Sequence, residues 1–249
     1  MSGRNPMTLR TTLFSVAFAA VVIAGASIYL LRSLIPGTAN LDAVRETVLP
    51  DLEVQLAEQG LRLGAPIFIR IFKASSELEL WVEDGERFSL FKTYPICSYS
   101  GDLGPKLREG DRQSPEGFYS VSAGQLNPNS SYHLSFNLGF PNRYDRSHGR
   151  TGSFLMVHGK CVSIGCYAMT DRGIEEIYLL AEAALKDGQN AFDVHIFPFR
   201  MTEEALAEHA GSPWIGFWEN LKEGHDLFEA ERVPPTAGVA DGRYAFSGR

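Results

Sequence analysis

Residues 66–96, PIFIRIFKASSELELWVEDGERFSLFKTYPI, indicate the fold class of the chain. Short runs of apolar, β-branched and aromatic residues fill this stretch, and residues 83–86 (Glu-Asp-Gly-Glu) separate two of them as a hairpin turn would. Such runs predict strands, so we expect a mainly β fold with peripheral helices. The runs lie at 66–73, 78–83, 87–96, 117–122, 153–158 and 192–199.

Helical periodicity appears outside these runs. A spacer helix is expected within 38–60, with Pro50 in its first turn and Gly60 as its stop. A second helix is expected from Thr170 to Lys186, capped by Thr170 or Asp171. The other expected elements are a polar, site-forming flap at 122–152, helices near 203–209 and 214–223, and a flexible end beyond Pro234.

The N-terminus predicts export. The stretch from Leu13 to Leu31 has 19 uncharged residues, with arginines on both sides. As a helix it would be about 28 Å long, close to the thickness of a bilayer core. It fits either an uncleaved membrane anchor or a signal peptide cleaved before Ser27. Both alternatives place the chain from about Thr38 onward in the periplasm, because the basic side stays inside.

The charge of the remaining chain disfavours nucleic acid as a partner. With residues 1–37 set aside, 20 basic and 30 acidic side chains give a formal charge of −10. Phosphate binding requires a basic surface, and the sequence carries no nucleic-acid-binding motif.

Three cysteines, Cys97, Cys161 and Cys166, follow the leader. In an oxidising compartment an odd number leaves at least one thiol free or bonded to another molecule. A Cys97–Cys161 bridge would leave Cys166 free, but the sequence alone leaves the pairing open.

Residues 157–166, VHGKCVSIGC, contain the residue types of a thiol-based site. A strand ends where this window begins, and a helix starts just after it, so Cys166 would lie in a turn beside exposed backbone N–H groups. A loop that folds back would bring His158 to the sulfur and lower the pKa of the thiol. The alternative is a buried cysteine near a strand-end histidine without chemistry.

A metal site is a further alternative. The spacing of its ligands matches no common zinc pattern, so we expect neither a metal nor another cofactor. The ligands would be His158, Cys161 and Cys166, with His148 or His195 as the fourth.

The window also resembles a known family. His158-Gly159 followed by Ser163-Ile164-Gly165-Cys166 is similar to the signature of the L,D-transpeptidase catalytic domain (YkuD type), in which a His-Gly strand end precedes Ser/Thr-His-Gly-Cys. Upstream, Gly-Pro-Lys at 104–106 and GDRQSPEGFY at 110–119 resemble segments of the same family, and 144–152 resembles its loop before the histidine strand. The resemblance covers roughly residues 66–200.

Two features depart from the family pattern. Only four residues separate His158 from Ser163, where the family has fourteen or more, and Ile164 replaces the second histidine. Tyr167 and Ala168 stand where an aliphatic residue and an arginine usually follow the cysteine, so a substrate-facing cation is missing. Candidates for substrate binding in its place are Arg143, Arg146, Arg150, Arg200, Tyr144 and Tyr167.

The resemblance implies a β-sandwich-like, peptidoglycan-modifying cysteine enzyme. Cys166 would form a thioester with the third residue of a stem peptide, and His158 would protonate the leaving amine. Gly165 and Cys166 would hold the oxyanion, while Ser163 and Gly159 would orient the loop.

Three functions follow as alternatives. The first is a transpeptidase, in which an amine acceptor attacks the thioester and receives the acyl group. The others are an L,D-specific hydrolase that cleaves wall-linked peptide or protein, and a non-catalytic peptidoglycan-binding module. The expected division is 1–37 signal or anchor, 38–60 spacer helix, 61–200 catalytic domain, and 201–249 helical extension with a flexible tail.

Overall fold

The computed structural model describes residues 38–247. The predicted signal or anchor therefore lies outside the described residues. Within 38–247, no helix is both long and apolar enough to cross a bilayer. The helices are α2 (Leu41–Glu58), α3 (Arg143–Ser147), α4 (Asp171–Lys186), α5 (Glu203–Glu208) and α6 (Ile215–Glu231), with a 3-10 turn at Ala123–Gln125.

The strands form a nine-stranded mixed sheet and a separate hairpin. The order in the large sheet is β4-β9-β1-β2-β3-β8-β7-β6-β5, and β10 pairs with β11. Their bounds are β1 (Ile67–Phe72), β2 (Glu77–Asp84), β3 (Arg87–Ser98), β4 (Gly117–Ser122), β5 (Leu126–Asn127), β6 (Ser135–Asn137), β7 (Met156–His158), β8 (Tyr167–Met169), β9 (Ala191–Phe197), β10 (Thr236–Ala240) and β11 (Arg243–Ser247).

The long strand β3 joins two halves of the large sheet. Its first part pairs with β2, whereas Ile96 and Ser98 at its end pair with β8. Strands that pass from one sheet to another in this way form the corners of sandwiches. The two ends of the large sheet also approach each other. The Gln125 amide, between β4 and β5, donates to the carbonyls of Ser120 in β4 (3.4 Å) and Asn137 in β6 (2.9 Å). The predicted mainly β class is confirmed, with nine of the eleven described strands in one sheet.

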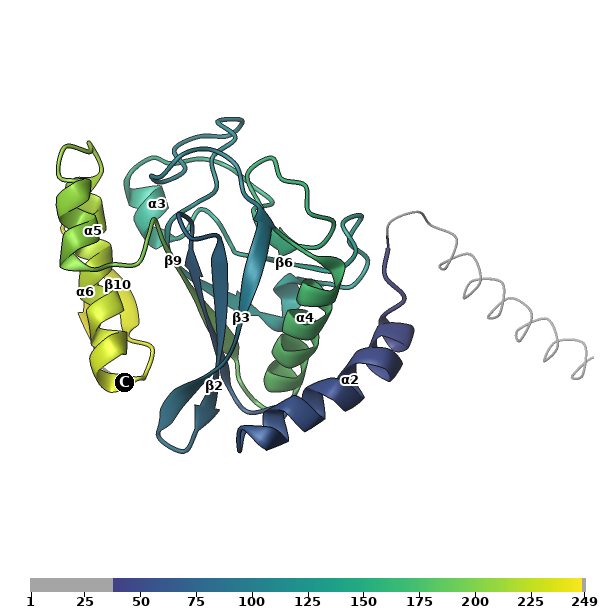
Figure 1. Cartoon of the computed structure of the whole chain (residues 1–249). Coiled ribbons are helices and arrows are strands. Elements are labelled where there is room, and N and C mark those ends of the chain that lie inside the picture. Colours follow the sequence, from purple (N-terminus) through teal and green to yellow (C-terminus); the bar gives the residue numbers. More distant parts are fainter. Residues whose placement is uncertain (1–37, 248–249) are drawn as a thin grey trace, which may run out of the picture.

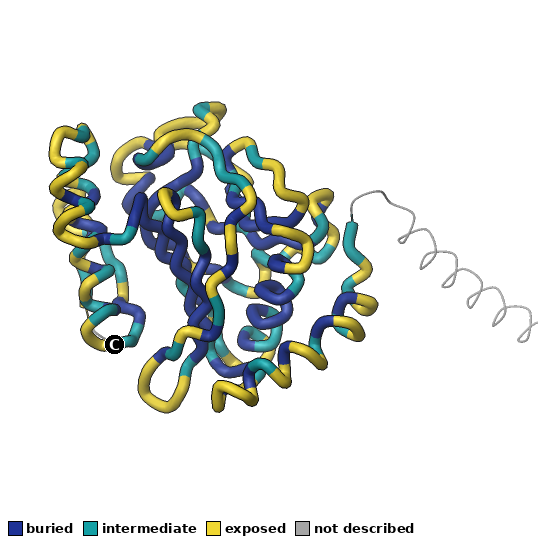
Figure 2. Tube along the Cα trace, viewed as in Figure 1, coloured by how far each residue is buried: buried dark blue, intermediate teal, exposed yellow. Residues whose placement is uncertain are grey.

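Helices cover both faces of this sheet. Figure 1 shows α2 and α4 on one side and α5 and α6 on the other, and the strands between them are its most buried part (Figure 2). All six residues of β1 are buried for this reason. Ile67, Ile69 and Ile71 pack into the core beneath α2 and α4, and Phe72 packs into the core beneath α6.

The helix α2 differs from the expected spacer. It begins at Leu41 instead of Pro50, with the Asn40 side chain accepting a hydrogen bond from the Ala43 N–H. Its buried stripe of Val44, Val48, Leu52 and Leu56 belongs to the core shared with α4. The regular four-residue spacing of that stripe explains why the helix continues through Pro50. The prediction that α2 is a spacer is therefore wrong, and α2 is a packed layer of the fold.

The helix α4 has the predicted bounds. The Thr170 hydroxyl oxygen accepts a hydrogen bond from the Gly173 N–H at 3.0 Å, which makes Thr170 the cap. Burial of the predicted apolar face, including Ile174 and Ile177, orients the chain that enters the helix from β8.

Two stretches contain more regular structure than the sequence predicts. Residues 122–152, expected as a flap, include β5, β6 and α3. The expected flexible end instead forms the hairpin β10–β11, and Tyr244 of that hairpin is buried against Phe118. The helix α6 continues to Glu231, eight residues past its expected end near Glu223.

Candidate active site

The two predicted catalytic residues lie at one pair of neighbouring strands. The strands β7 and β8 are parallel, with Val157 opposite Tyr167 and His158 opposite Ala168. His158 is the last residue of β7, and Cys166 directly precedes β8, where its sulfur contacts the Met156 N–H at the start of β7. Both residues thus belong to the same two-strand unit, near opposite ends of β7.

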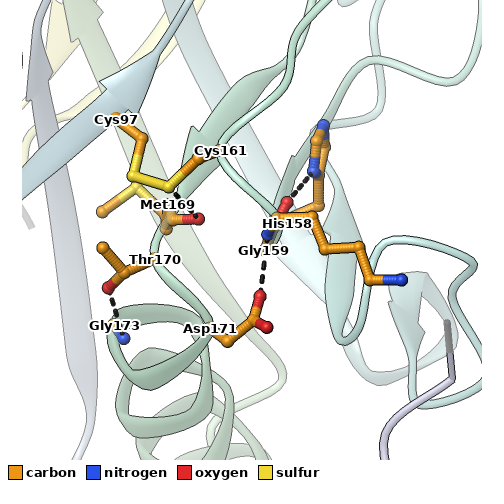
Figure 3. Close-up of a disulfide and its surroundings, with 9 residues drawn as sticks. Cys97, His158, Gly159, Cys161, Met169, Thr170, Asp171 and Gly173 are labelled. Atoms are coloured by element: carbon orange, nitrogen blue, oxygen red, sulfur yellow. Dashed lines mark hydrogen bonds between the residues drawn. A yellow bond between two sulfur atoms is a disulfide. The ribbon is translucent and has the colours of Figure 1, made fainter.

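A disulfide fixes the loop that connects these strands. Cys161 bonds to Cys97 near the end of β3, which leaves Cys166 as the free cysteine (Figure 3). The Cys161 N–H also donates to the Met169 carbonyl at 3.3 Å. The loop is therefore held to β3 and β8 at a point five residues before Cys166.

Gly159 allows this loop to approach the start of α4 closely. A Cβ atom at this position would lie 2.7 Å from Asp171 Oδ1 and 3.1 Å from Ile174 Cγ2, closer than side-chain atoms normally come. The Asp171 carboxylate accepts the N–H of Lys160 at 2.8 Å. Gly159 is thus required by close packing at the end of β7.

Cys166 is half-buried, and its sulfur contacts backbone groups of the strand beside it. The Met156 N–H donates to the sulfur at 3.4 Å, and the thiol donates to the Phe154 carbonyl at 3.6 Å. Burial raises the pKa of the Cys166 thiol, whereas the Met156 N–H and the positive charge of Lys106 oppose this rise. The expected lowering of the thiol pKa is not found.

The His158 ring is held in a defined orientation. Its ring Nδ1 lies 2.7 Å from the Gly159 carbonyl, which can only accept, so the proton is on Nδ1 (Figure 3). This leaves the lone pair on Nε2. Burial lowers the pKa of His158. Between residues 38 and 247 no hydrogen bond joins His158 to Cys166, and the ring instead lies 4.7 Å from the ring of Tyr132.

Three serines hold the backbone around Cys166. The carbonyl of Cys166 accepts hydrogen bonds from Ser163 Oγ (2.7 Å) and Ser114 Oγ (3.0 Å). The Gly165 N–H donates to Ser100 Oγ and to Ser163 Oγ (3.3 Å). This N–H is therefore engaged within the protein, and Ser163 contacts the loop backbone.

Ser100 and Ser114 were not among the site residues predicted from the sequence. Nothing in the sequence window around Cys166 points to either residue, since Ser114 lies 52 residues before it. The one sequence signal for Ser114 was that it lies in the GDRQSPEGFY segment, which resembles the family. That resemblance assigned no role to the serine.

The predicted substrate-binding arginines contact other parts of the protein. Arg150 is buried and pairs with Asp145 at 2.9 Å. Arg200 pairs with Glu77 and Glu79. Arg146 donates to the Pro141 carbonyl.

The tyrosine candidates and Arg143 also lie away from the sulfur. Tyr167 is fully buried, and its hydroxyl donates to the Pro115 carbonyl at 2.7 Å. The Tyr144 ring stacks on Tyr244 at 4.3 Å. Arg143, Tyr144 and Arg146 border a cavity of about 330 Å³ whose lining does not include Cys166.

The surface beside Cys166 is apolar. Phe154, Val162 and Ile164 are exposed by 75%, 54% and 81%. Phe154 supplies the carbonyl that contacts the sulfur, and the other two belong to the 159–166 loop. The site thus presents a thiol next to apolar side chains. Within residues 38–247 no cluster of three or more His, Cys, Asp or Glu side chains is arranged for a metal ion.

These features, a free thiol and an oriented imidazole at one pair of parallel strands in a mainly β fold, define a candidate cysteine-dependent site. Residues 66–191 match the L,D-transpeptidase catalytic domain (YkuD), and the chain belongs to that family. The predicted resemblance is confirmed.

A curated relative agrees with this family assignment. The chain is 53% identical over 185 residues to the putative L,D-transpeptidase YafK of Escherichia coli K12, covering 74% of this chain and 75% of YafK. Among solved structures, it is similar to the helical cell shape determining protein Pgp2 of Campylobacter jejuni (K307A mutant; 17% identity, TM-score 0.44, 71% of this chain and 63% of Pgp2). Bd1075 of Bdellovibrio bacteriovorus is also similar (21% identity, TM-score 0.36, 66% of this chain and 60% of Bd1075).

Proposed function

We propose that the protein is a peptidoglycan-modifying cysteine enzyme that transfers the acyl group of the third residue of a stem peptide. Family membership supports acyl transfer as the reaction class. The single observation that supports the residue assignment is that Cys166, the free cysteine of the described chain, contacts the strand that ends in His158, while the other two cysteines are bridged. The structure offers this one free thiol in the described chain.

The reaction proceeds through a thioester. The Cys166 sulfur attacks the carbonyl carbon of the third residue, and the Nε2 lone pair of His158 accepts the thiol proton. The tetrahedral intermediate collapses as its C–N bond breaks, and His158 returns the proton to the leaving amine. We assign the oxyanion contact to the Cys166 N–H, because the Gly165 N–H is engaged by Ser100 and Ser163. Attack of an amine on the thioester then releases the product and restores the thiol.

Mass spectrometry of a disaccharide tetrapeptide incubated with the chain tests this proposal. Loss of terminal D-alanine with gain of an added amine is the expected result. Cys166→Ala is expected to abolish it, and His158→Gln to reduce it strongly, whereas His148→Gln, which alters an exposed histidine, serves as the control. Full turnover by Cys166→Ala would refute the mechanism.

Hydrolysis is the second candidate function. The arginines that were candidates for holding a substrate carboxylate are paired elsewhere, which favours water over a charged acceptor. In the same assay, hydrolysis gives loss of D-alanine without gain of an amine. If no wall peptide or wall-linked protein changes mass, the site is a non-catalytic peptidoglycan-binding module.

The proposed place of action is the periplasm. The apolar stretch at 13–31 and the Cys97–Cys161 disulfide both support export, because such bonds persist in oxidising compartments. The mass of the mature N-terminus distinguishes an uncleaved anchor from a signal peptide cleaved before Ser27.

A further inference from the structure

A buried ion pair outside the proposed catalytic pair lies behind the Cys166 loop. Lys73 follows β1, Glu116 precedes β4, and only 0% and 1% of their surfaces are exposed. The Lys73 ammonium lies 3.0 Å from Glu116 Oε1. Burying two charges costs several kcal/mol per ion unless further hydrogen bonds satisfy them. The partners that satisfy this pair therefore show which parts of the fold it holds together.

Those partners lie in the segment 102–116. The Lys73 ammonium donates to the carbonyls of Asp102 (2.7 Å), Gly104 (3.1 Å) and Ser114 (3.2 Å). The Glu116 carboxylate accepts the Gly104 N–H at 2.7 Å. One charge pair thus holds both ends of the segment in a fixed arrangement.

The C-terminal helix α6 supplies the remaining partner. The Trp218 indole N–H donates to Glu116 Oε2 at 2.8 Å, and Trp218 is buried. Trp214 packs so closely over Gly104 that a Cβ there would lie 2.7 Å from its Nε1. Both tryptophans lie beyond residue 191, where the match to the family ends. The extension therefore makes direct contact with the 102–116 segment.

The segment in turn holds the backbone of the nucleophile. Ser114 is fully buried, and its hydroxyl donates to the Cys166 carbonyl at 3.0 Å while accepting the Ser100 N–H at 3.1 Å. The Pro115 carbonyl accepts the hydroxyl of Tyr167, the residue after Cys166, at 2.7 Å. An unbroken chain of hydrogen bonds thus runs from Trp218 through Glu116, Lys73 and Ser114 to Cys166.

We propose that Trp218, Glu116, Lys73 and Ser114 are positioning residues that fix the Cys166 backbone, so that the C-terminal extension is a working part of the active site. This inference rests on the proposed function only in taking Cys166 as the reacting group. The chain of contacts keeps the sulfur beside the Met156 N–H, a contact that depends on the position of residue 166.

Alkylation of Cys166 by iodoacetamide tests the proposal without requiring turnover. Under non-reducing conditions it is the one free thiol of the described chain, and the full chain has no fourth cysteine. The test variant is Trp218→Phe, which keeps the buried ring and removes the indole N–H. The control is Trp81→Phe, since Trp81 is also buried and its N–H donates to a carboxylate, that of Glu79.

We expect Trp218→Phe to move the pH midpoint of alkylation by about 0.5 unit or more, and Trp81→Phe to leave it unchanged. Ser114→Ala should shift the pH midpoint by a similar amount. If Trp218→Phe does not fold, Ser114→Ala replaces it as the test variant. In the turnover assay, kcat should fall about tenfold while KM changes little. An unchanged midpoint in both test variants, or an equal shift in Trp81→Phe, would overturn the proposal. If the alkylation midpoint shifts in the test variants but the chain turns over no wall peptide, the positioning proposal is supported and the proposed function is refuted.

Discussion

Removal of the Cys97–Cys161 disulfide gives a stability change that follows from the structure. The bond closes a loop with a sequence separation of 64 residues, which includes β4 to β7. In the chain-entropy relation, opening a loop of this length costs about 4 kcal/mol of stability. Both cysteines are exposed, so replacing them with alanine removes little buried surface. The entropy of the unfolded chain should therefore account for most of the loss.

Urea unfolding measures this loss. We expect Cys97→Ala/Cys161→Ala, made in a Cys166→Ala background to prevent thiol exchange, to unfold at a urea concentration roughly 1.5 M below that of the background variant. Reduction of the background variant should give a similar shift, because it removes the same bond by another route.

A shift below about 0.3 M in both experiments would refute the reasoning, because a bond closing this loop must stabilise the fold. If the urea midpoint falls on reduction but not in the alanine variant, the alanine substitutions themselves compensate locally for the stability lost with the bond. Circular dichroism before unfolding serves as the control for an intact starting fold.

Three further predictions concern individual residues. Gly159→Ala should destabilise the protein by about 1–3 kcal/mol in urea, because its Cβ would lie 2.7 Å from Asp171 Oδ1, whereas Gly216→Ala, with open space around its Cβ, should be tolerated. Burial lowers the pKa of His195 well below its ordinary 6.5. Below about pH 6.5 the unfolded chain therefore binds a proton at His195 that the folded chain does not bind, so the free energy of unfolding should decrease as the pH is lowered through this range. His195→Leu should remove about 2 kcal/mol of the difference in unfolding free energy between about pH 7.5 and 5, and an unchanged difference would contradict this assignment. Acylation by a β-lactam, read as an adduct in intact-protein mass, should be lost in Cys166→Ala and retained in His148→Gln, and an adduct on Cys166→Ala would place the nucleophile elsewhere.

Local patterns were sufficient to predict the longer strands of the large sheet and the cap of α4. Apolar runs at 66–96 became β1, β2 and β3, and Thr170 caps α4, as one of the two predicted alternatives. The window at 157–166 also singled out His158 and Cys166, which lie at strands connected by a single loop. Features that depend on a few consecutive residues are therefore readable from the sequence.

Features that depend on the register between distant strands were not predictable. The bond between Cys97 and Cys161 requires β3 to pair with β8 at Ile96 and Ser98, and no local pattern fixes that register. Lys73 ends the apolar run at 66–73, and nothing in that run indicates that its ammonium is buried. It became buried because a carboxylate 43 residues later in the chain neutralises it.

The hairpin at 236–247 was missed although the sequence carries a local signal for it. Asp241-Gly242 is a favoured two-residue hairpin turn, and the apolar residues on either side of it alternate and pack against one core (Ala237, Val239, Tyr244 and Phe246). Pro50 misled the prediction of α2 in the opposite way. A proline favours a helix start, yet the buried stripe on both sides of it outweighed that preference.

Burial disfavours the charged forms of both proposed catalytic residues. It raises the pKa of Cys166 and lowers that of His158, which opposes both the thiolate and the imidazolium. The proposed mechanism therefore has the thiol proton move to His158 as the sulfur attacks. Such coupled transfer depends on the distance between sulfur, Nε2 and the substrate carbonyl at the moment of reaction. Under this mechanism, precise support of the Cys166 backbone matters more than it would with a preformed thiolate, and this is the role that we propose for the buried contacts from α6.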